Sequence, residues 1–330
     1  MYRFYFDCGT SNIRGYLLED RKVVGWKQLG IGSKDVSISS SREILINGLK
    51  SIYDEVIGAA GISDTEVAAL YASGMVTSPY GLVEVPHALL PLDKEKIRES
   101  IFVYHEDSLF HRTINLIRGA KTAEGPLSMD SIDSVNNFRG EEMEVLGACS
   151  HIPRDWKCSK YIILLPGSHT HAILLENETL IDIFSIFSGE IFHALTTATI
   201  LSSSTDVKNR TVKADREAIR FGCDFFRKYG FARAVYIVHA MKIFDVADNS
   251  KRRDCLSSIV ISSVVQSLLS NMEGKWSGVT NIAISGAKNI VETYSEVIRQ
   301  LAPGINVLLL PHEEAGTASS VEGFISLTCG

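Results

Sequence analysis

The sequence lacks any long uninterrupted apolar run of the kind that forms a membrane-spanning helix. Its longest apolar stretch, residues 259–269, is broken by serines and a glutamine, whereas a spanning helix needs about 18 apolar residues in succession. The first ten residues also lack the cationic segment and apolar core that mark a secretory signal peptide. These absences predict a cytoplasmic protein with no membrane partner.

Excess positive charge and paired cysteines are also missing. The chain has 33 Lys and Arg against 39 Asp and Glu, a net charge of −6, and nucleic-acid binders usually show the opposite balance. This charge balance predicts no nucleic-acid partner.

None of the six cysteines forms a C-x-x-C pair, which argues against a zinc ribbon. Because no export signal is recognisable either, we expect the cysteines to be reduced thiols.

The composition that remains is that of a folded globular protein. Hydrophobic residues make up 45% of the chain and charged residues 22%, which excludes a disordered chain. At about 150 residues per domain, the length predicts two domains. The polar stretch 155–160 shows no apolar periodicity, so we place the boundary there. The expected domains are 1–155 and 156–330, with the last helix free to pack back on the first domain.

Hydrophobic periodicity predicts an α/β fold in which both halves follow one plan. Each half begins with a β-meander that contains a turn rich in Gly, Ser and Thr, and then continues into helices. The first half is expected to contain strands at 2–6, 14–19, 21–28, 67–72 and 116–118 and helices at 41–59 and 141–149, with 94–107 either helix or loop. The second half is expected to contain strands at 161–165, 171–177, 179–186, 281–285 and 306–310 and helices at 189–201, 215–228, 232–247, 252–272, 290–301 and 315–327.

The first candidate phosphate loop is Asp7–Asn12, which follows the first strand. An Asp at the end of a buried strand can hold Mg²⁺ or its waters, and Gly9 lets the backbone approach phosphate oxygens closely. Thr10 and Ser11 offer further hydrogen-bond donors, as does Asn12. The same residue types are typical of a capped hairpin turn, so both interpretations stay open.

The second candidate phosphate loop occupies the same place in the second half. Gly167 and Ser168 could form a cradle there, with His169 donating a hydrogen bond to a phosphate. Ser168 and His169 could instead form a nucleophile and base, but adjacent strand residues point to opposite faces. His169 and His171 could also begin a metal site, although no carboxylate or cysteine lies nearby in the sequence.

A third motif, residues 138–142, combines an arginine with two glutamates. Arg139 is suited to bind a carboxylate or phosphate through two hydrogen bonds. Glu141 or Glu142, at the start of a predicted helix, could act as a general base toward a hydroxyl. Alternatively, the two glutamates have no catalytic role: they lie in solvent and stabilise the first turn of the helix through its dipole.

Three further segments give weaker signals. Gly189 and Glu190 precede a predicted helix and could mark no more than its start. Gly286 lies in a strand–turn–helix segment that could hold part of a nucleotide at the helix N-terminus. Met75 lies in a loop that could line a small-molecule pocket.

Taken together in their order along the chain, the motifs resemble those of the 2-dehydro-3-deoxygalactonokinase family, which belongs to the sugar kinase/actin/heat-shock ATPase superfamily. The most specific segments are DCGTSNIRGYL (7–17), NNFRGEEMEVLGA (136–148) and LLPGSHTHAI (164–173), and others lie at 73–87, 181–195 and 284–289. The resemblance implies two ribonuclease-H-like domains with mixed sheets flanked by helices and ATP between the domains. It also implies transfer of the γ-phosphate to the 6-hydroxyl of a 2-keto-3-deoxy sugar acid, foremost 2-dehydro-3-deoxygalactonate.

Roles carried over by position follow from this resemblance. Asp7 would hold Mg²⁺, and Glu141 or Glu142 would deprotonate the sugar hydroxyl. Phosphate and ATP contacts are expected at Gly9, Thr10, Ser11, Asn12, Gly167, Ser168, His169 and Gly286, and substrate contacts at Arg14, Met75, Arg139, Gly189 and Glu190.

The chain departs from the family pattern near the expected phosphates. Cys8 stands where members commonly have Trp, His171-Ala172 where they have Lys-Trp, and Gly316-Thr317 where they have Gly-Asp. His171 could replace the lost lysine charge only if it is protonated. Two alternatives therefore stay open: a kinase of the same fold for another sugar or polyol, and a non-catalytic nucleotide or sugar binder. A homodimer is compatible with the sequence.

Overall fold

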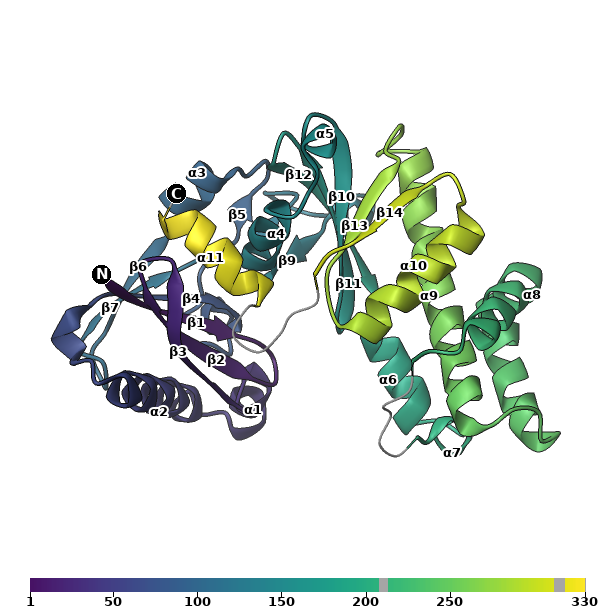
Figure 1. The fold of residues 1–330 in the computed structure, drawn as a ribbon, viewed down its shortest axis with the longest axis horizontal. Helices are drawn as coiled ribbons and strands as arrows, with labels where there is room; N and C mark the ends of the chain where they lie inside the picture. Colours follow the sequence, from purple (N-terminus) through teal and green to yellow (C-terminus); the bar gives the residue numbers. More distant parts are fainter. Residues whose placement is uncertain (208–212, 312–317, 330) are drawn as a thin grey trace. The chain divides into compact units, whose positions relative to one another are not determined.

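The computed structural model describes residues 1–207, 213–311 and 318–329, which divide into two compact units (Figure 1). Unit 1 contains residues 1–152, residues 178–183 and the described C-terminal residues 318–329. Unit 2 contains residues 153–177 and the described part of 184–311. The chain thus leaves unit 1 after Ile152 and ends in it again. Gly316-Thr317 lie outside the described residues.

Unit 1 is built on a six-stranded mixed sheet with the order β3-β2-β1-β4-β7-β6. The predicted meander is present, because β1 pairs antiparallel with β2 and β2 with β3, while β4 and β7 add in parallel. The strands are β1 (Tyr2–Cys8), β2 (Ile13–Glu19), β3 (Lys22–Leu29), β4 (Val67–Gly74), β6 (Phe102–Glu106) and β7 (Arg112–Leu116). A smaller sheet joins β5 (Ala88–Leu89), β8 (Ala120–Lys121) and β9 (Asn137–Phe138).

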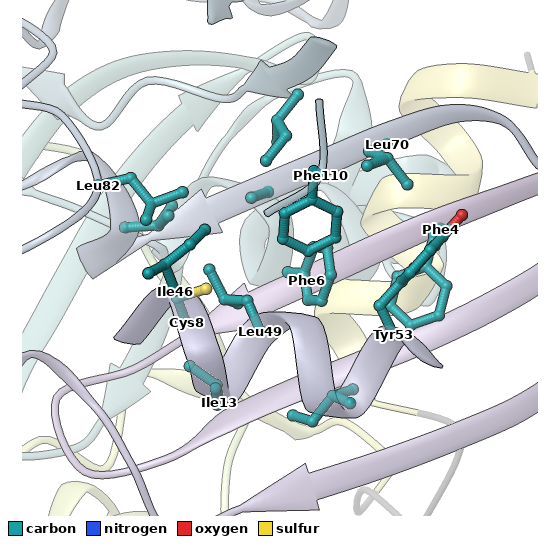
Figure 2. Packing of buried hydrophobic residues seen from close by; sticks show 14 of the residues in the cluster. Phe4, Phe6, Cys8, Ile13, Ile46, Leu49, Tyr53, Leu70, Leu82 and Phe110 are labelled. Carbon is teal, nitrogen blue, oxygen red and sulfur yellow. The ribbon is translucent and has the colours of Figure 1, made fainter. Parts of the chain in front are cut away.

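Side chains of β1 alternate between the two faces of this sheet, as the pleat requires. Phe4, Phe6 and Cys8 belong to the core that α2 (Glu43–Ala60) covers, where Phe4 meets Tyr53 edge-on at 5.0 Å (Figure 2). Tyr5 lies on the other face, where its ring stacks on Phe324 of α11 (Ser319–Cys329) at 4.5 Å. This alternation also turns the side chain of Asp7 toward α11.

Helix α11 packs closely on α4 (Glu141–Cys149) because each helix presents a glycine at the crossing. A Cβ on Gly147 would lie 2.0 Å from the carbonyl oxygen of Ser319, and one on Gly323 would lie 1.9 Å from that of Met143. Only glycine therefore allows the two backbones to approach this closely. The short helices of this unit are α1 (Ser33–Ser39) and α3 (Lys94–Glu99), with 3-10 turns at Asp64–Glu66, Met75–Thr77 and Ile132–Ser134.

The expectations for unit 1 were wrong in two places. The strand predicted at 116–118 is β7, which ends at Leu116, and the open stretch 94–107 contains both α3 and β6. Helix α1 was not predicted, because its serine-rich sequence shows no apolar periodicity. Its start is fixed instead by the preceding loop, where Lys34 donates its backbone N–H to the carbonyl of Thr10 at 3.0 Å.

Unit 2 repeats the strand arrangement of unit 1 in the order β12-β11-β10-β13-β14. Again three consecutive strands are followed by two that add in parallel, β13 beside β10 and β14 beside β13. The strands are β10 (Lys160–Pro166), β11 (His169–Glu176), β12 (Thr179–Phe187, of which residues 179–183 belong to unit 1), β13 (Asn281–Ile284) and β14 (Asn306–Leu309). The two mixed sheets flanked by helices confirm the predicted α/β class.

The helices of unit 2 differ from the prediction mainly at their ends. The segments 215–228 and 232–247 form one long helix, α8, which is interrupted at Gly230 with a non-helical φ of 73° and ψ of 176°. The predicted helix 189–201 ends early and a second short helix follows it. The helices are α5 (Arg154–Lys157), α6 (Gly189–Thr197), α7 (Ser202–Thr205), α8 (Arg216–Ile243), α9 (Asn249–Glu273) and α10 (Lys288–Leu301).

Helix α9 is long and apolar enough to cross a membrane by length and composition. However, 61% of its apolar window is buried inside the protein, where it packs against α8 and α10. It also buries the polar side chains of Arg252, Asp254 and Ser258. This pattern is typical of the central helix of a globular domain.

Candidate functional site

Asp7, at the end of β1, is the central carboxylate of the candidate site in unit 1. Its Oδ2 accepts a hydrogen bond from Oγ of Ser320 at 3.0 Å and lies 3.5 Å from Nη1 of Arg14. Arg14 lies opposite Asp7 in the β1–β2 register, which explains the ion pair. The Asp7 side chain keeps 17% of its surface exposed, so it is held in place yet accessible to a ligand.

The loop after Asp7 is a tight turn whose backbone packs on α1. Gly9 donates its N–H to the carbonyl of Asn12 at 2.8 Å, while Thr10 and Ser11 are exposed at the tip. A Cβ on Gly32 would lie only 2.3 Å from the carbonyl oxygen of Thr10. This close approach fixes the turn against the start of α1, and the sequence analysis did not single out Gly32.

Two glycines with positive φ bring the ends of β1 and β4 to the start of α4. Gly74 has a φ of 84°, and a Cβ there would lie 2.3 Å from the carbonyl oxygen of Cys8. Gly140 has a φ of 115°, and its Cβ would lie 3.1 Å from Cα of Gly74. The structure thereby places Met75, which directly follows Gly74, and the two glutamates of α4 in the same region as the end of β1.

Both glutamates at the start of α4 accept backbone hydrogen bonds from the turn before the helix. Arg139 donates its N–H to Oε2 of Glu141 at 2.9 Å, and Gly140 donates its N–H to Oε2 of Glu142 at 2.8 Å. Glu142 is 1% exposed, and its second carboxylate oxygen, Oε1, is buried without a hydrogen-bond partner among the described residues. Glu141 keeps more of its surface exposed.

Burial keeps both carboxyl groups from ionising at their usual pH. Desolvation raises the pKa of Glu141 to about 7, against the opposing effect of its backbone hydrogen bonds. Desolvation raises the pKa of Glu142 to about 8, with a further contribution from the neighbouring charge of Glu141. Groups with a pKa near neutral pH are well suited to exchange a proton with a substrate hydroxyl.

The guanidinium of Arg139 binds the loop 77–87 of its own unit. It donates to the backbone carbonyls of Thr77 and Val85, at 2.6 and 3.2 Å, and lies 3.3 Å from Nδ1 of His87. Burial and the charge of Arg139 lower the pKa of His87 to about 4, so this histidine is neutral near pH 7. In this structure Arg139 therefore holds a loop, which sequence reasoning did not anticipate.

In unit 2, the predicted second phosphate turn lies between β10 and β11. Gly167 donates its N–H to the carbonyl of His169 at 2.8 Å, which closes the turn. Glu190, in the first turn of α6, donates its N–H to the carbonyl of Ser168 at 2.9 Å. A Cβ on Gly189 would lie 2.4 Å from the carbonyl oxygen of Gly167, so α6 starts directly against this turn.

Gly286 joins the same region of unit 2 from the loop between β13 and α10. It has a φ of 147°, and a Cβ there would lie 3.5 Å from the carbonyl oxygen of Pro166. Ser285, beside it, donates its N–H to the carbonyl of Leu164 at 3.1 Å. The structure thus brings together three loops that the sequence singled out separately: the turn after β10 and the starts of α6 and α10.

His171 does not supply the positive charge that the departure from the family pattern removes. It is 8% exposed, and burial lowers its pKa to about 4, so it is neutral near pH 7. Its Nδ1 lies 2.9 Å from Oγ of Ser185. Within the part of the chain that the structure describes, no cluster of three or more His, Cys, Asp or Glu could hold a metal ion, so His169 and His171 do not begin such a cluster there.

Sequence reasoning missed Ser320 altogether. It lies in a small-residue stretch of α11, more than 300 positions from Asp7, and no motif in the sequence links the two. Only the packing of α11 on unit 1 brings its hydroxyl to the Asp7 carboxylate.

Comparison with known proteins identifies one matching family and several solved structures of similar fold. Residues 7–319 match the family described as DGOK, 2-keto-3-deoxy-galactonokinase. A solved structure from Sinorhizobium meliloti, provisionally assigned as a 2-dehydro-3-deoxygalactonokinase, has a TM-score of 0.75 at 18% identity, covering 98% of this chain and 97% of that chain. Component A of (R)-2-hydroxyglutaryl-CoA dehydratase from Acidaminococcus fermentans has a TM-score of 0.50 at 12% identity, covering 98% and 97%. No curated protein matches the sequence.

Proposed function

The chain belongs to the 2-keto-3-deoxy-galactonokinase family and is a sugar-acid kinase, and from this premise we propose that it transfers the γ-phosphate of ATP to the 6-hydroxyl of 2-dehydro-3-deoxygalactonate. In this reaction the hydroxyl oxygen forms a bond to the γ-phosphorus as the bond to ADP breaks, and the hydroxyl proton passes to a base. Such transfers depend mainly on positioning and on neutralising charge. The proposed base and metal-binding carboxylates lie in unit 1.

The observation that carries this proposal is the set of three carboxylates around the ends of β1 and β4. Asp7 is held by Ser320 and Arg14, which keep it in position with its charge partly balanced. The two glutamates of α4 have pKa values near neutral pH because they are buried. One fixed carboxylate together with a carboxyl that can take up a proton is the combination that phosphoryl transfer to a hydroxyl requires.

We assign the base to Glu141 and not to Glu142. Glu141 keeps part of its surface exposed, so a substrate hydroxyl can approach it, whereas Glu142 is 1% exposed. Burial gives Glu141 a pKa of about 7, so an appreciable fraction is ionised near neutral pH. Glu142, which is mostly protonated near pH 7 because its pKa is raised to about 8, would then act by accepting the backbone N–H of Gly140 and so holding the turn before α4.

The residues at Asp7 fit a magnesium ion bound mainly through the nucleotide. Mg²⁺ is commonly held in proteins by one or two carboxylates, with waters and substrate phosphates completing its coordination. One carboxylate therefore suffices, and the unpartnered Oε1 of Glu142 leaves a second buried oxygen in this part of unit 1. When bound, Mg²⁺ supplies positive charge to the phosphates.

In each unit, taken by itself, the glycine turn is a proposed contact for nucleotide phosphate. Gly9, Thr10, Ser11 and Asn12 would contribute in unit 1, and Gly167, Ser168 and His169 in unit 2. The exposed tip at Thr10 and Ser11 supports this assignment because backbone amides at such turns bind anions. Gly9 and Gly167 use their own N–H groups to close the two turns. Gly286 would lie on the adenosine side.

The substrate carboxylate is proposed to bind Arg14. Its neighbour Asp7 places it beside the reaction centre, while Arg139 already donates to two backbone carbonyls of the loop 77–87. Arg139 would then shape the substrate pocket, with Met75, by holding that loop. Glu190 remains a proposed substrate contact at the start of α6.

A coupled ADP-release assay with Mg·ATP tests the proposed reaction. The substrates would be 2-keto-3-deoxygalactonate, 2-keto-3-deoxygluconate and several neutral hexoses and polyols. We expect turnover on the galactonate. Turnover on a neutral sugar alone would move the substrate to another class, and nucleotide binding without turnover on any compound would contradict the proposed catalysis.

A further inference from the structure

Helix α11 places the hydroxyl of Ser320 against the carboxylate of Asp7. Ser320 is 2% exposed, and its Oγ lies 3.0 Å from Oδ2 of Asp7. The two residues are 313 positions apart in the sequence, so this contact exists only because the C-terminal helix packs in unit 1. A hydrogen bond to an ionised acceptor is among the stronger ones in proteins.

The position of Ser320 is fixed by the packing of α11 on both sides. Gly147 and Gly323 allow α11 to lie against α4, where a Cβ on either would come within 2.0 Å of a backbone oxygen. On the sheet side, Phe324 stacks on Tyr5 with an interplanar angle of 5°, and the Tyr5 hydroxyl lies 2.7 Å from Oγ of Ser73. A side chain held in this way keeps its hydroxyl at one place and limits the rotation of the carboxylate that accepts from it.

The same helix therefore contacts both parts of the proposed catalytic centre. Through Ser320 it holds Asp7, and through the glycine crossing it holds α4, whose first two residues are Glu141 and Glu142. Residues that hydrogen-bond to a metal-binding carboxylate set its orientation, and their removal commonly lowers metal affinity or activity by about 10- to 100-fold.

We propose that Ser320 is a positioning residue that orients the Asp7 carboxylate for the divalent cation of the bound nucleotide. The inference rests on the proposed role of Asp7 in the kinase reaction. It predicts that Ser320→Ala weakens cation binding while the chemical step is largely restored when the cation is in excess. A purely structural role would instead lower stability and leave the cation dependence unchanged.

The test compares Ser320→Ala with Ser326→Ala, which makes the same chemical change further along α11. Mn²⁺ binding to each variant in the presence of ADP is measured by electron paramagnetic resonance, where no turnover occurs. The Mg²⁺ concentration for half-maximal kinase activity is measured in parallel. In Ser320→Ala we expect the dissociation constant for Mn²⁺ and the Mg²⁺ concentration for half-maximal activity each to rise about tenfold. This is the low end of the usual range, because Arg14 also contacts Asp7. Ser326→Ala should match the wild type, and Ser320→Thr, which keeps the hydroxyl, should recover much of the affinity.

Two controls separate failure of this inference from failure of the proposed function. If the wild type shows no kinase activity, or if Asp7→Asn retains it, the proposed function fails. If the wild type is active and depends on Asp7 while Ser320→Ala binds Mn²⁺ as tightly as the wild type, the positioning role is overturned. Thermal melting of every variant shows whether loss of affinity reflects loss of the fold, and a melting change with unaltered cation affinity also overturns the role.

Discussion

The backbone N–H of Arg139 donates a hydrogen bond to Oε2 of Glu141 over 2.9 Å, just before α4 begins. This bond favours the ionised carboxylate, while burial disfavours it, and the balance leaves a pKa of about 7. A general base must be ionised to accept a proton, so its activity is present above its pKa and lost below it.

We therefore predict that kcat/KM for the sugar acid falls as the pH drops through about 7. Glu141→Gln should lower kcat by roughly 100- to 10,000-fold, the usual contribution of a general base. Its residual activity should no longer show this pH dependence. Steady-state rates between pH 5.5 and 9 measure both effects. A Glu141→Gln variant with the wild-type kcat would show that Glu141 is not the general base.

Glu142 should make the stability of the protein depend on pH in the opposite sense to most carboxylates. Its folded-state pKa of about 8 lies above the ordinary value of 4.5. A raised pKa contributes stability that is complete below the unfolded-state value and is lost as the pH rises through the folded-state value.

Glu142→Gln keeps the side-chain shape and removes the ionisation. We predict that it raises the free energy of unfolding above pH 8, by on the order of a few kcal/mol, and has little effect near pH 4.5. Urea unfolding at several pH values without nucleotide or cation measures the difference. A difference that does not change with pH would contradict the raised pKa.

Gly323→Ala should destabilise unit 1 because the new methyl group would lie 1.9 Å from the carbonyl oxygen of Met143. We expect a loss of about 1–3 kcal/mol, as for overpacking elsewhere. Gly58→Ala is the matched control, since a Cβ there meets nothing within 4 Å on the exposed side of α2, and it should be neutral or stabilising. Equal melting temperatures for the two variants would show that the α4–α11 crossing tolerates a methyl group.

Arg139→Lys and Arg14→Lys should have different effects on substrate choice. A lysine at 139 cannot donate to both Thr77 and Val85 as the guanidinium does, so the loop 77–87 should loosen and all substrates should lose affinity alike. A lysine at 14 should raise KM more for acid substrates than for neutral analogues. The KM values of both variants on both substrate types decide this. If Arg139→Lys raises KM only for acid substrates, Arg139 binds the substrate carboxylate.

The sequence predicted the fold well where periodicity was strong, and less well where packing decided the outcome. The meander of β1–β3 and helix α4 follow directly from alternation and from the Gly140–Glu141 helix start. Helix α1 could not be predicted, because the carbonyl of Thr10 and not apolar spacing fixes its start.

The motifs also gave the separate loops of the candidate site but not their connections. Gly74 and Gly140 were recognisable as glycines in loops, yet their close approach, in which a Cβ on Gly140 would lie 3.1 Å from Cα of Gly74, depends on the tertiary fold. The contacts of Arg139 could not be predicted for the same reason, since its partners Thr77 and Val85 lie more than 50 positions away. Ser320 carried no local signal at all.

The most direct test of the central claim is to compare wild type and Asp7→Asn on 2-keto-3-deoxygalactonate with Mg·ATP, using ³¹P NMR to locate the phosphate in the product. We predict that the wild type forms a phosphomonoester at the 6-hydroxyl and releases ADP. We also predict that Asp7→Asn, with an unchanged circular dichroism spectrum, is slower by at least about 100-fold, as for loss of a charged group at a reaction centre. A wild-type enzyme that forms no sugar phosphate, or an Asp7→Asn variant that forms it at the wild-type rate, would contradict the account.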